Sequence, residues 1–234
     1  MNIALILSGG TGARLLFDIP KQYIEICGKP VISYCIRSLS SHERIEWIHI
    51  VADPAWQKQI ESWLTESDSG KKFKGFSAPG ANRQLSILYG LKDIRKYAND
   101  TDNILIHDAA RPMLSQKQIT ACLDAAEGHD GVVPVLPMKD TVYSSTDGKR
   151  ITALLHRNAI YGGQAPEVFK LGVYYDANCM LLPDRILKIN GSTEPAVMAG
   201  LDVVMIPGDE NNFKITTKTD LERFRKIAEE TSTR

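Results

Sequence analysis

The sequence predicts an α/β fold: a doubly wound, mostly parallel β-sheet with a protruding β-hairpin arm. Two observations predict the sheet, namely continuous apolar runs typical of strands covered on both faces and amphipathic helical patterns that alternate with them. A third predicts the arm, since the alternation breaks after about residue 137. We expect one domain over residues 1–234, with the arm at about 138–160.

The strands and helices of the sheet alternate along the first half of the chain. Strands are expected at residues 2–7, 45–52, 103–109 and 131–138, and the helical patterns between them cover residues 30–41, 54–64, 82–98 and 115–128. In the second pattern, one helical face carries Trp56, Ile60, Trp63 and Leu64. We expect this face to pack into the core rather than to stack on a ligand.

The arm is predicted from residues 138–157, which form two extended segments joined by Asp147-Gly148, a dipeptide that favours tight hairpin turns. An isolated hairpin cannot bury both of its faces, so we expect it to pack on a partner. Two further strands are expected after it. They cover residues 202–208 and 211–216, and a closing helix follows at 217–230, capped by Thr217 or Thr219.

Composition narrows the possible partners. The 28 Lys and Arg residues balance 28 Asp and Glu residues, so no basic field is present to attract nucleic acid or an anionic membrane. The cysteines are widely spaced without a C-x-x-C pair, which argues against a zinc site or a disulfide framework. The first apolar run lacks a basic flank and is far shorter than the roughly 18 residues of a membrane helix. We expect a soluble, cytoplasmic protein with reduced thiols.

The segment SGGTGARLLFDIPKQY, residues 8–23, follows the first strand and combines three glycines with two cations. It lacks the Gly-Lys pair of a phosphate-loop NTPase, and Leu15 stands where a dinucleotide fingerprint has its third glycine. Glycines let backbone N–H groups converge on an anion, and Arg14 and Lys21 add charge. The segment therefore favours a triphosphate site, and a glycine-rich turn with surface cations is the alternative.

Five ordered motifs extend this prediction over nearly the whole chain: HDAARP (107–112), GANRQLSILYGL (80–91), MKDTVYSS (138–145), HRNAIYGGQAPEVF (156–169) and NNFKITTKTDLE (211–222). Together they resemble the family of cytidylyltransferases that make CDP-linked polyols from CTP and a polyol phosphate. The resemblance implies a Rossmann-like sheet of the nucleotide-diphospho-sugar transferase type, Mg²⁺ as cofactor, and a homodimer formed through the arm.

The resemblance also implies roles for individual residues. The catalytic residues would be Arg14, Lys21 and Lys214; the nucleotide-binding residues Ser8, Gly9, Gly10, Thr11, Gly12, Gly80, Ala81, Arg83 and Ser86; the substrate-binding residues Arg111, Asp140, Thr141 and Arg157; and the metal-binding residue Asp108. The chain departs from the family at Ala81, where an acidic or hydroxyl residue is usual, and at Pro79, where glycine is common. Backbone groups near Gly80 are then expected to carry more of the cytosine recognition.

The implied chemistry needs cations and positioning more than a base. A phosphate monoester is largely a dianion near pH 7, so it can attack the α-phosphorus of CTP directly. The charge that builds on the phosphoryl group and the leaving oxygen must be stabilised, and Arg14 and Lys21 are the candidates. Asp108 lies where doubly wound sheets bind ligands.

Structural alternatives remain for several of these residues. Asp108 could be a helix N-cap, Arg111 a surface ion-pair partner of Asp108, Lys214 a solvated residue of an edge strand, and Arg157 an exposed charge of the hairpin. None of the five histidines has ligand spacing or is expected to be catalytic. In the related chains, residues matching Thr141 and Arg157 reach across the dimer to the polyol phosphate.

The polyol phosphate is predicted from two altered motifs. The methylerythritol branch usually shows Thr-Asp before the late helix and Gln-Thr-Pro-Gln after the arm, whereas this chain has Thr193-Glu194 and QAPE at residues 164–167. The segment RNAIYGGQAPEVF resembles the ribitol branch, so we expect D-ribitol 5-phosphate as substrate. The alternatives are 2-C-methyl-D-erythritol 4-phosphate, a catalytically silent nucleotide-binding protein, and a sugar-1-phosphate nucleotidyltransferase.

Overall fold

The computed structural model describes residues 1–10, 19–66 and 70–232. The strands are β1 (Asn2–Leu7), β2 (Glu25–Ile26), β3 (Lys29–Pro30), β4 (Trp47–Val51), β5 (Phe73–Ser77), β6 (Asn103–Asp108), β7 (Gly131–Pro137), β8 (Val142–Ser144), β9 (Ala153–Leu155), β10 (Tyr161–Gly163), β11 (Glu167–Lys170) and β12 (Val203–Pro207). The α-helices are α1 (Val31–Ser41), α2 (Pro54–Glu66), α3 (Arg83–Ile94), α4 (Gln116–Ala125), α5 (Leu171–Cys179), α6 (Glu194–Met198) and α7 (Lys218–Ser232). Short 3₁₀ turns lie at Lys21–Tyr23, Gly70–Lys72, Arg157–Ala159 and Arg185–Lys188.

The central sheet has the order β10-β7-β11-β6-β1-β4-β5, and β12 pairs with β7. Strand β1 runs parallel to β4 and to β6, and β4 runs parallel to β5. Strand β11 is antiparallel to both β6 and β7. The mostly parallel α/β sheet expected from the sequence is therefore confirmed, with an antiparallel insertion between β6 and β7.

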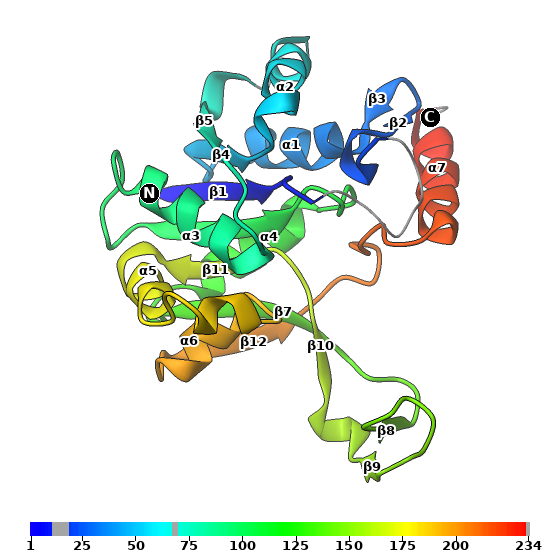
Figure 1. Ribbon diagram of the computed structural model, residues 1–234. Coiled ribbons are helices and arrows are strands. Elements are labelled where there is room, and N and C mark those ends of the chain that lie inside the picture. Colours follow the sequence, from blue (N-terminus) through cyan, green and yellow to red (C-terminus); the bar gives the residue numbers. More distant parts are fainter. Residues whose placement is uncertain (11–18, 67–69, 233–234) are drawn as a thin grey trace.

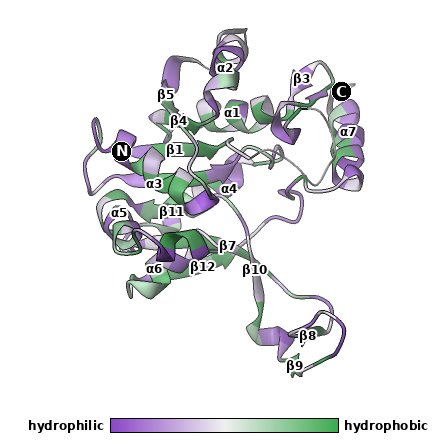
Figure 2. Ribbon diagram, viewed as in Figure 1, coloured by the Kyte–Doolittle hydropathy of each residue, from purple (hydrophilic) through white to green (hydrophobic). Residues whose placement is uncertain are grey.

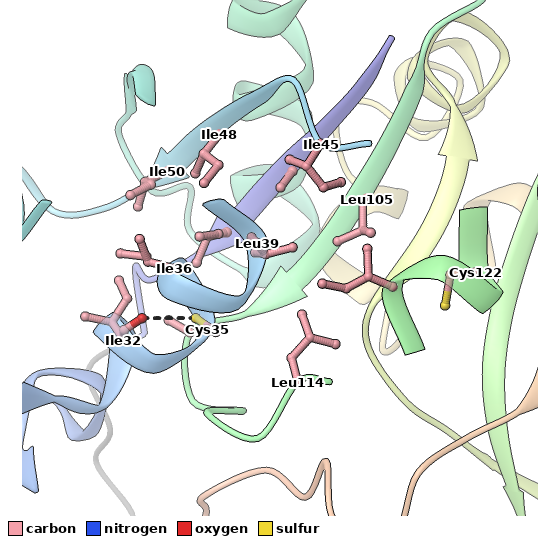
Figure 3. Close-up of a cluster of buried hydrophobic side chains, with 14 of the residues drawn as sticks. Ile32, Cys35, Ile36, Leu39, Ile45, Ile48, Ile50, Leu105, Leu114 and Cys122 are labelled. Carbon is pink, nitrogen blue, oxygen red and sulfur yellow. Dashed lines mark hydrogen bonds between the residues drawn. The ribbon is translucent and has the colours of Figure 1, made fainter. Parts of the chain in front are cut away.

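Alternating side chains of the strands enter two cores. On one face, Ile6 and Leu105 join the helices α1, α2 and α4. Figure 3 shows part of this cluster, in which the Cys35 thiol donates a 3.2 Å hydrogen bond to the Ile32 carbonyl. On the other face, Leu5 and other strand residues pack against α3, α5 and α6. Both faces of the sheet are covered, which explains why its strands read as continuous apolar runs.

The prediction that one face of α2 packs into the core is confirmed. Ile60 and Leu64 are buried in the first core, and Trp56 and Trp63 pack against it. The cysteines of the described residues are free, and burial raises the pKa of the Cys35 thiol to about 12. Within the described part of the chain, no helix is long and apolar enough to cross a bilayer. Figure 2 shows the hydrophobic residues concentrated in the central strands.

The arm projects from the sheet beyond β7 and β10 (Figure 1). Strands β8 and β9 form a separate antiparallel pair, with Val142 opposite Leu155. The prediction of a tight turn at Asp147-Gly148 is wrong in the length of the turn. Residues 145–152 form a longer connection between the two strands. The Asp147 carboxylate organises this connection by accepting the N–H groups of Lys149 and Arg150, each at 2.8 Å.

The prediction of a strand at residues 211–216 is also wrong. These residues form no ladder; the Ile215 N–H donates a single bond to the Ala110 carbonyl at 2.8 Å, and the buried Asn212 amide donates to the Ala165 carbonyl at 2.6 Å. The segment is irregular and is held by isolated backbone and side-chain hydrogen bonds. Helix α7 follows it, and the Thr217 hydroxyl accepts the Asp220 N–H as its cap, as one of the two expectations had it.

Candidate active site

A cavity of about 530 Å³ lies at the carboxyl ends of β1 and β6. Leu7 and Asp108, the last residues of these strands, are directly paired across the sheet. The expected site residues that line the cavity are Gly9, Gly10, Lys21, Gly80, Ala81, Arg83, Ser86, Asp108 and Lys214. Thr11, Gly12 and Arg14 lie outside the described residues. Open parallel sheets bind ligands at such strand ends, where the backbone of the loops is accessible.

The start of the glycine segment is held from below by the 3₁₀ turn that contains Lys21. The Gln22 side-chain amide donates to the carbonyls of Ser8 and Gly10, at 2.8 Å each. The buried Ser8 hydroxyl bonds to the Tyr23 hydroxyl at 2.9 Å, so Ser8 supports the segment rather than lining the cavity. Tyr23 in turn stacks on Trp56, with ring centroids 4.3 Å apart. The two residues after Lys21 therefore fix the backbone at this position, Gln22 through hydrogen bonds and Tyr23 through packing in the core.

The loop before α3 forms the opposite wall and is tied to its own helix. The Asn82 side chain caps α3 by accepting the Leu85 N–H at 2.8 Å. The Ser86 hydroxyl accepts the Gly80 N–H at 3.0 Å and donates to the Asn82 carbonyl at 2.9 Å. A Cβ at Gly80 would lie 2.4 Å from the Leu85 Cβ, so a side chain there would clash. Glycine at this position keeps the loop against the helix.

Asp108 is the centre of a charge cluster at the floor of the cavity. Its carboxylate lies 2.9 Å from Arg83 Nη2, 3.0 Å from Lys214 Nζ and 3.5 Å from Arg111 Nε. Burial acts to raise the pKa of Asp108, but the charges of Arg83, Lys214 and Arg111 outweigh it and hold that pKa far below its ordinary value. The cluster therefore carries an excess of positive charge that favours phosphate oxygens.

Helix capping, the alternative for Asp108, is not what its side-chain contacts show, because its side chain bonds to cations from three other positions. Lys214, expected in a strand, reaches the cluster from the irregular segment at residues 211–216. Neighbouring His107 is fully buried, and burial lowers its pKa to about 4. Its Nε2 donates to the Arg111 carbonyl at 2.9 Å, which makes it a neutral structural residue.

Arg111 links this cavity to a second hollow of about 470 Å³. Its guanidinium donates to the Asn212 carbonyl at 2.7 Å, and its Nε is buried without a hydrogen-bond partner. The second hollow is also lined by Gln164, Phe213 and the last residues of β7. Arg111 therefore pairs with Asp108, but this ion pair is largely buried rather than at the surface as the alternative had it. Arg111 also lines a space next to the first cavity.

The arm residues stand apart from this cluster. Thr141 and Arg157 line a third hollow of about 300 Å³ on the arm itself, together with Leu154 and His156. The Arg157 guanidinium donates to the Lys139 carbonyl at 3.0 Å, and Asp140 is exposed. Among the described residues, the structure thus brings together most of those expected to bind nucleotide together with Asp108, and leaves those expected on the arm outside the cavity of their own chain.

A Mg²⁺ ion fits this site only in company with a ligand that brings its own oxygens. Among the described residues, no group of three or more His, Cys, Asp or Glu side chains could hold a metal ion. Asp108 is the one acidic side chain in the cavity lining of the described residues. Each carboxylate oxygen has two lone pairs, so Asp108 can accept a cation beside its present partners. Mg²⁺ commonly binds through one carboxylate plus substrate phosphates.

Two residues of the site received no role from the sequence. Gln22 fixes the glycine segment, and glutamine beside a lysine in a turn carries no distinctive pattern. Glu167 is buried behind the charge cluster, where its carboxylate accepts hydrogen bonds from the hydroxyls of Ser192 and Thr193. The sequence feature that could have pointed to Glu167 is the last residue of QAPE, which is glutamate where the methylerythritol branch usually has glutamine.

Comparisons with known proteins find relatives that match nearly the whole chain. The sequence family described as 2-C-methyl-D-erythritol 4-phosphate cytidylyltransferase matches residues 2–230. A protein of that name from Nitrosomonas eutropha is 32% identical over 97% of each chain. The bifunctional enzyme IspD/IspF of Granulibacter bethesdensis is 34% identical over 97% of this chain, which spans 56% of that longer protein.

Solved structures share the fold. That of 4-diphosphocytidyl-2C-methyl-D-erythritol synthase from Anaerococcus prevotii superposes with a TM-score of 0.81. The two chains are 22% identical, and the match covers 98% of this chain and 96% of the other. This likeness supports the mixed α/β architecture with its mostly parallel central sheet.

Proposed function

Because the chain belongs to the 2-C-methyl-D-erythritol 4-phosphate cytidylyltransferase family and is a nucleotidyltransferase, we propose that it transfers CMP from CTP to 2-C-methyl-D-erythritol 4-phosphate and releases pyrophosphate. The observation that carries the proposal is the cluster of Arg83, Arg111 and Lys214 around Asp108 at the strand ends, in a chain that matches the family over nearly its full length.

The comparisons favour this substrate over ribitol 5-phosphate, which the altered motifs had led us to expect. The family and the relative from Nitrosomonas eutropha, which matches over 97% of its length, both carry the methylerythritol name. One of the two altered positions also has a local explanation, because the Glu194 carboxylate accepts the Asn190 N–H at 2.9 Å and so serves the turn before α6. The departure at Glu194 therefore does not require a different polyol.

In the proposed reaction an oxygen of the acceptor phosphate attacks the α-phosphorus of CTP. A bond forms between them, and the bond from the α-phosphorus to the oxygen bridging to the β-phosphate breaks, so that pyrophosphate leaves with that oxygen. The acceptor is already a dianion near pH 7, so the residues act by position and charge. Gly9, Gly10 and Lys21 line the cavity where the nucleotide phosphates are assigned.

Lys214 and Arg111 occupy the border between the first and second hollows. We assign CTP to the first and the acceptor to the second, so that these two cations lie where the two polyanions meet. Asp108 orients both cations and is the residue that would hold Mg²⁺. The ion, when bound with CTP, neutralises charge on the phosphates.

The arm is assigned to the acceptor site of a second copy. Thr141 and Arg157 do not reach the cavity of their own chain, and the arm exposes apolar side chains to solvent. A homodimer in which each arm serves the partner's cavity accounts for both observations. Such an arrangement would have the self-complementary contacts of a twofold symmetric dimer.

The test is pyrophosphate release from CTP and Mg²⁺ with three acceptors: 2-C-methyl-D-erythritol 4-phosphate, ribitol 5-phosphate and a sugar 1-phosphate. We expect kcat/KM to be highest for the methylerythritol substrate by at least about 100-fold, since acceptor hydroxyl contacts decide specificity. A preference for ribitol 5-phosphate would restore the interpretation of the altered motifs. Absence of pyrophosphate with every acceptor would favour a silent nucleotide-binding protein.

A further inference from the structure

Glu167 is a buried residue whose carboxylate has no role in the proposed reaction. It begins β11, and only 8% of the residue is exposed. One carboxylate oxygen accepts the Ser192 hydroxyl, and the other accepts the Thr193 hydroxyl at 3.1 Å. Glutamate is rarely buried to this degree without a compensating charge. The position of that charge indicates what the side chain does.

The sheet register places Glu167 and Asp108 on the same face. Glu167 pairs with Ile106 across the antiparallel β11–β6 ladder, and cross-strand partners point to the same side. Asp108 lies two residues beyond Ile106 on β6, so it also points to that side. This face carries α3, the helix that begins with Arg83. Two carboxylates therefore converge from neighbouring strands beneath one guanidinium.

The two terminal nitrogens of the Arg83 guanidinium differ in their hydrogen bonds. Its Nη2 donates to Asp108 at 2.9 Å, whereas its Nη1 is buried with no hydrogen-bond partner. The negative charges of both Asp108 and Glu167 act on Arg83 and favour its charged form. Arg83 is thus held by a direct bond to one acid and by the field of a second.

We propose that Glu167 is a positioning residue for cytidylyl transfer, whose negative charge holds Arg83 between two acids and limits the positive charge of the phosphate site. Three cations surround Asp108, and a second buried acid leaves the cluster with a smaller positive excess. A site that binds the triphosphate too tightly in the ground state gains nothing in turnover.

The surroundings of Glu167 fix the conditions for a test. Burial raises the pKa of Glu167, and the charge of Asp108 adds to that effect, while Arg83 and the two hydroxyl donors oppose it. The titratable groups that act on it are Arg83 from α3, Asp108 from β6 and Tyr174 from α5. A higher pH favours the charged form of the carboxylate, so the measurements are made at pH 8.

The experiment compares Glu167→Gln with the wild-type chain, using CTP as the probe. Glutamine keeps the shape and removes the charge. In calorimetry at pH 8 without divalent metal, we expect the variant to bind CTP about tenfold more tightly, because a negative charge close to the phosphates is gone. In pyrophosphate release with Mg²⁺, we expect kcat to fall about tenfold. Glu167→Asp retains the charge and should stay within about twofold of wild type in CTP affinity.

The control is Glu222→Gln, which makes the same change in net charge on the exposed face of α7 and should alter neither quantity. A purely structural role for Glu167 predicts the opposite sign, with weaker CTP binding as the site loosens. Unchanged or weaker CTP binding, or tighter binding with a wild-type kcat, would overturn the proposal. Should the glutamine variant not fold, Glu167→Met removes the same charge and is measured in the same way.

This inference rests on the proposed function, and the two fail separately. A wild-type chain that neither binds CTP nor releases pyrophosphate would refute the proposed function. A wild-type chain that does both, beside a Glu167→Gln variant without the expected tightening, would refute only the role of Glu167.

Discussion

The nucleotide cavity and the arm differ in how completely one chain builds them. At the cavity, Asp108 is 7% exposed and has three cationic neighbours, which come from α3, from the loop after β6 and from the irregular segment at 211–216. On the arm, Tyr143, Ile151 and Leu154 are each more than half exposed, with values of 53%, 66% and 65%. The cavity is already organised to meet a polyanion, whereas the arm leaves apolar surface for another molecule to cover.

The difference teaches where each kind of residue acts. Buried ion pairs at strand ends fix charges before the substrate arrives, which is the condition for strong electrostatic stabilisation. A small two-stranded sheet gains stability mainly by packing on something larger. Variants of the cavity are therefore expected to affect the chemistry, and variants of the arm to affect the acceptor and the assembly.

The largest effect is expected for Lys21→Ala, which should lower kcat by about 10³-fold because a fixed cation at the phosphates is lost. The fold should be unchanged, since Gln22 and Tyr23 hold the segment independently of the lysine side chain. Steady-state pyrophosphate release and thermal unfolding measure the two. Lys58→Ala, an exposed lysine on α2, is the control. A wild-type rate in the Lys21 variant would remove that residue from the mechanism.

Asp108→Asn should lower the free energy of unfolding by about 3 kcal/mol, because it leaves buried cations without their counter-charge. Urea unfolding measures this change. The matched control is Asp124→Asn, which removes the exposed partner of Arg44 and should cost less than about 1 kcal/mol. Equal losses in the two variants would mean that the charge cluster is no more coupled to the fold than a surface ion pair.

Arg157→Ala should raise KM for the acceptor about tenfold and leave the Kd for CTP unchanged, if the arm serves the acceptor and the cavity serves the nucleotide. Acceptor titrations and calorimetry with CTP separate the two quantities. Arg150→Ala, exposed in the connection between β8 and β9, is the control on the same arm. A change in CTP affinity in the Arg157 variant would erase the distinction between the regions.

The smallest effect is the pH dependence of stability from Asp108. Its pKa in the folded chain lies below the unfolded value of about 4, so its stabilising contribution is fully present above that pH. The contribution is lost as pH falls below about 4 toward the lower folded pKa. The difference in unfolding free energy between wild type and Asp108→Asn should therefore be constant from pH 8 to about 5 and shrink below about 4. A difference that grows in acid would reverse the assigned sign.

The sequence predicted the parts of the fold that its apolar periodicity encodes strongly. The runs at 2–7 and 103–109 became β1 and β6 because both of their faces are buried. Strand β5 was missed, since FKGFS is short, mixes polar and apolar residues, and carries Gly75 at φ +149°. The segment at 211–216 resembled a strand, but isolated backbone and side-chain hydrogen bonds rather than a ladder hold it.

The candidate site could likewise be predicted only in part from the sequence. The residue types around the glycine segment indicated an anion site, and most of the expected residues that the structure describes do line one cavity. Periodicity could not show that Arg83, expected to bind the nucleotide, is bonded to Asp108. Nor could it show Glu167 behind them, because that relation depends on the register between β6 and β11.

A site shared between two chains is tested most directly by mixing the variants Lys21→Ala and Arg157→Ala and measuring pyrophosphate release after subunit exchange. The acceptor concentration is kept far below KM, where each variant alone has lost most of its rate. If one chain's cavity is served by its partner's arm, each mixed dimer regains one intact site. Equal mixing should then restore about a quarter of wild-type activity, as expected for random pairing in a twofold dimer. No recovery, with exchange demonstrated by tagged chains, would contradict the shared site and place Arg157 in the service of its own chain.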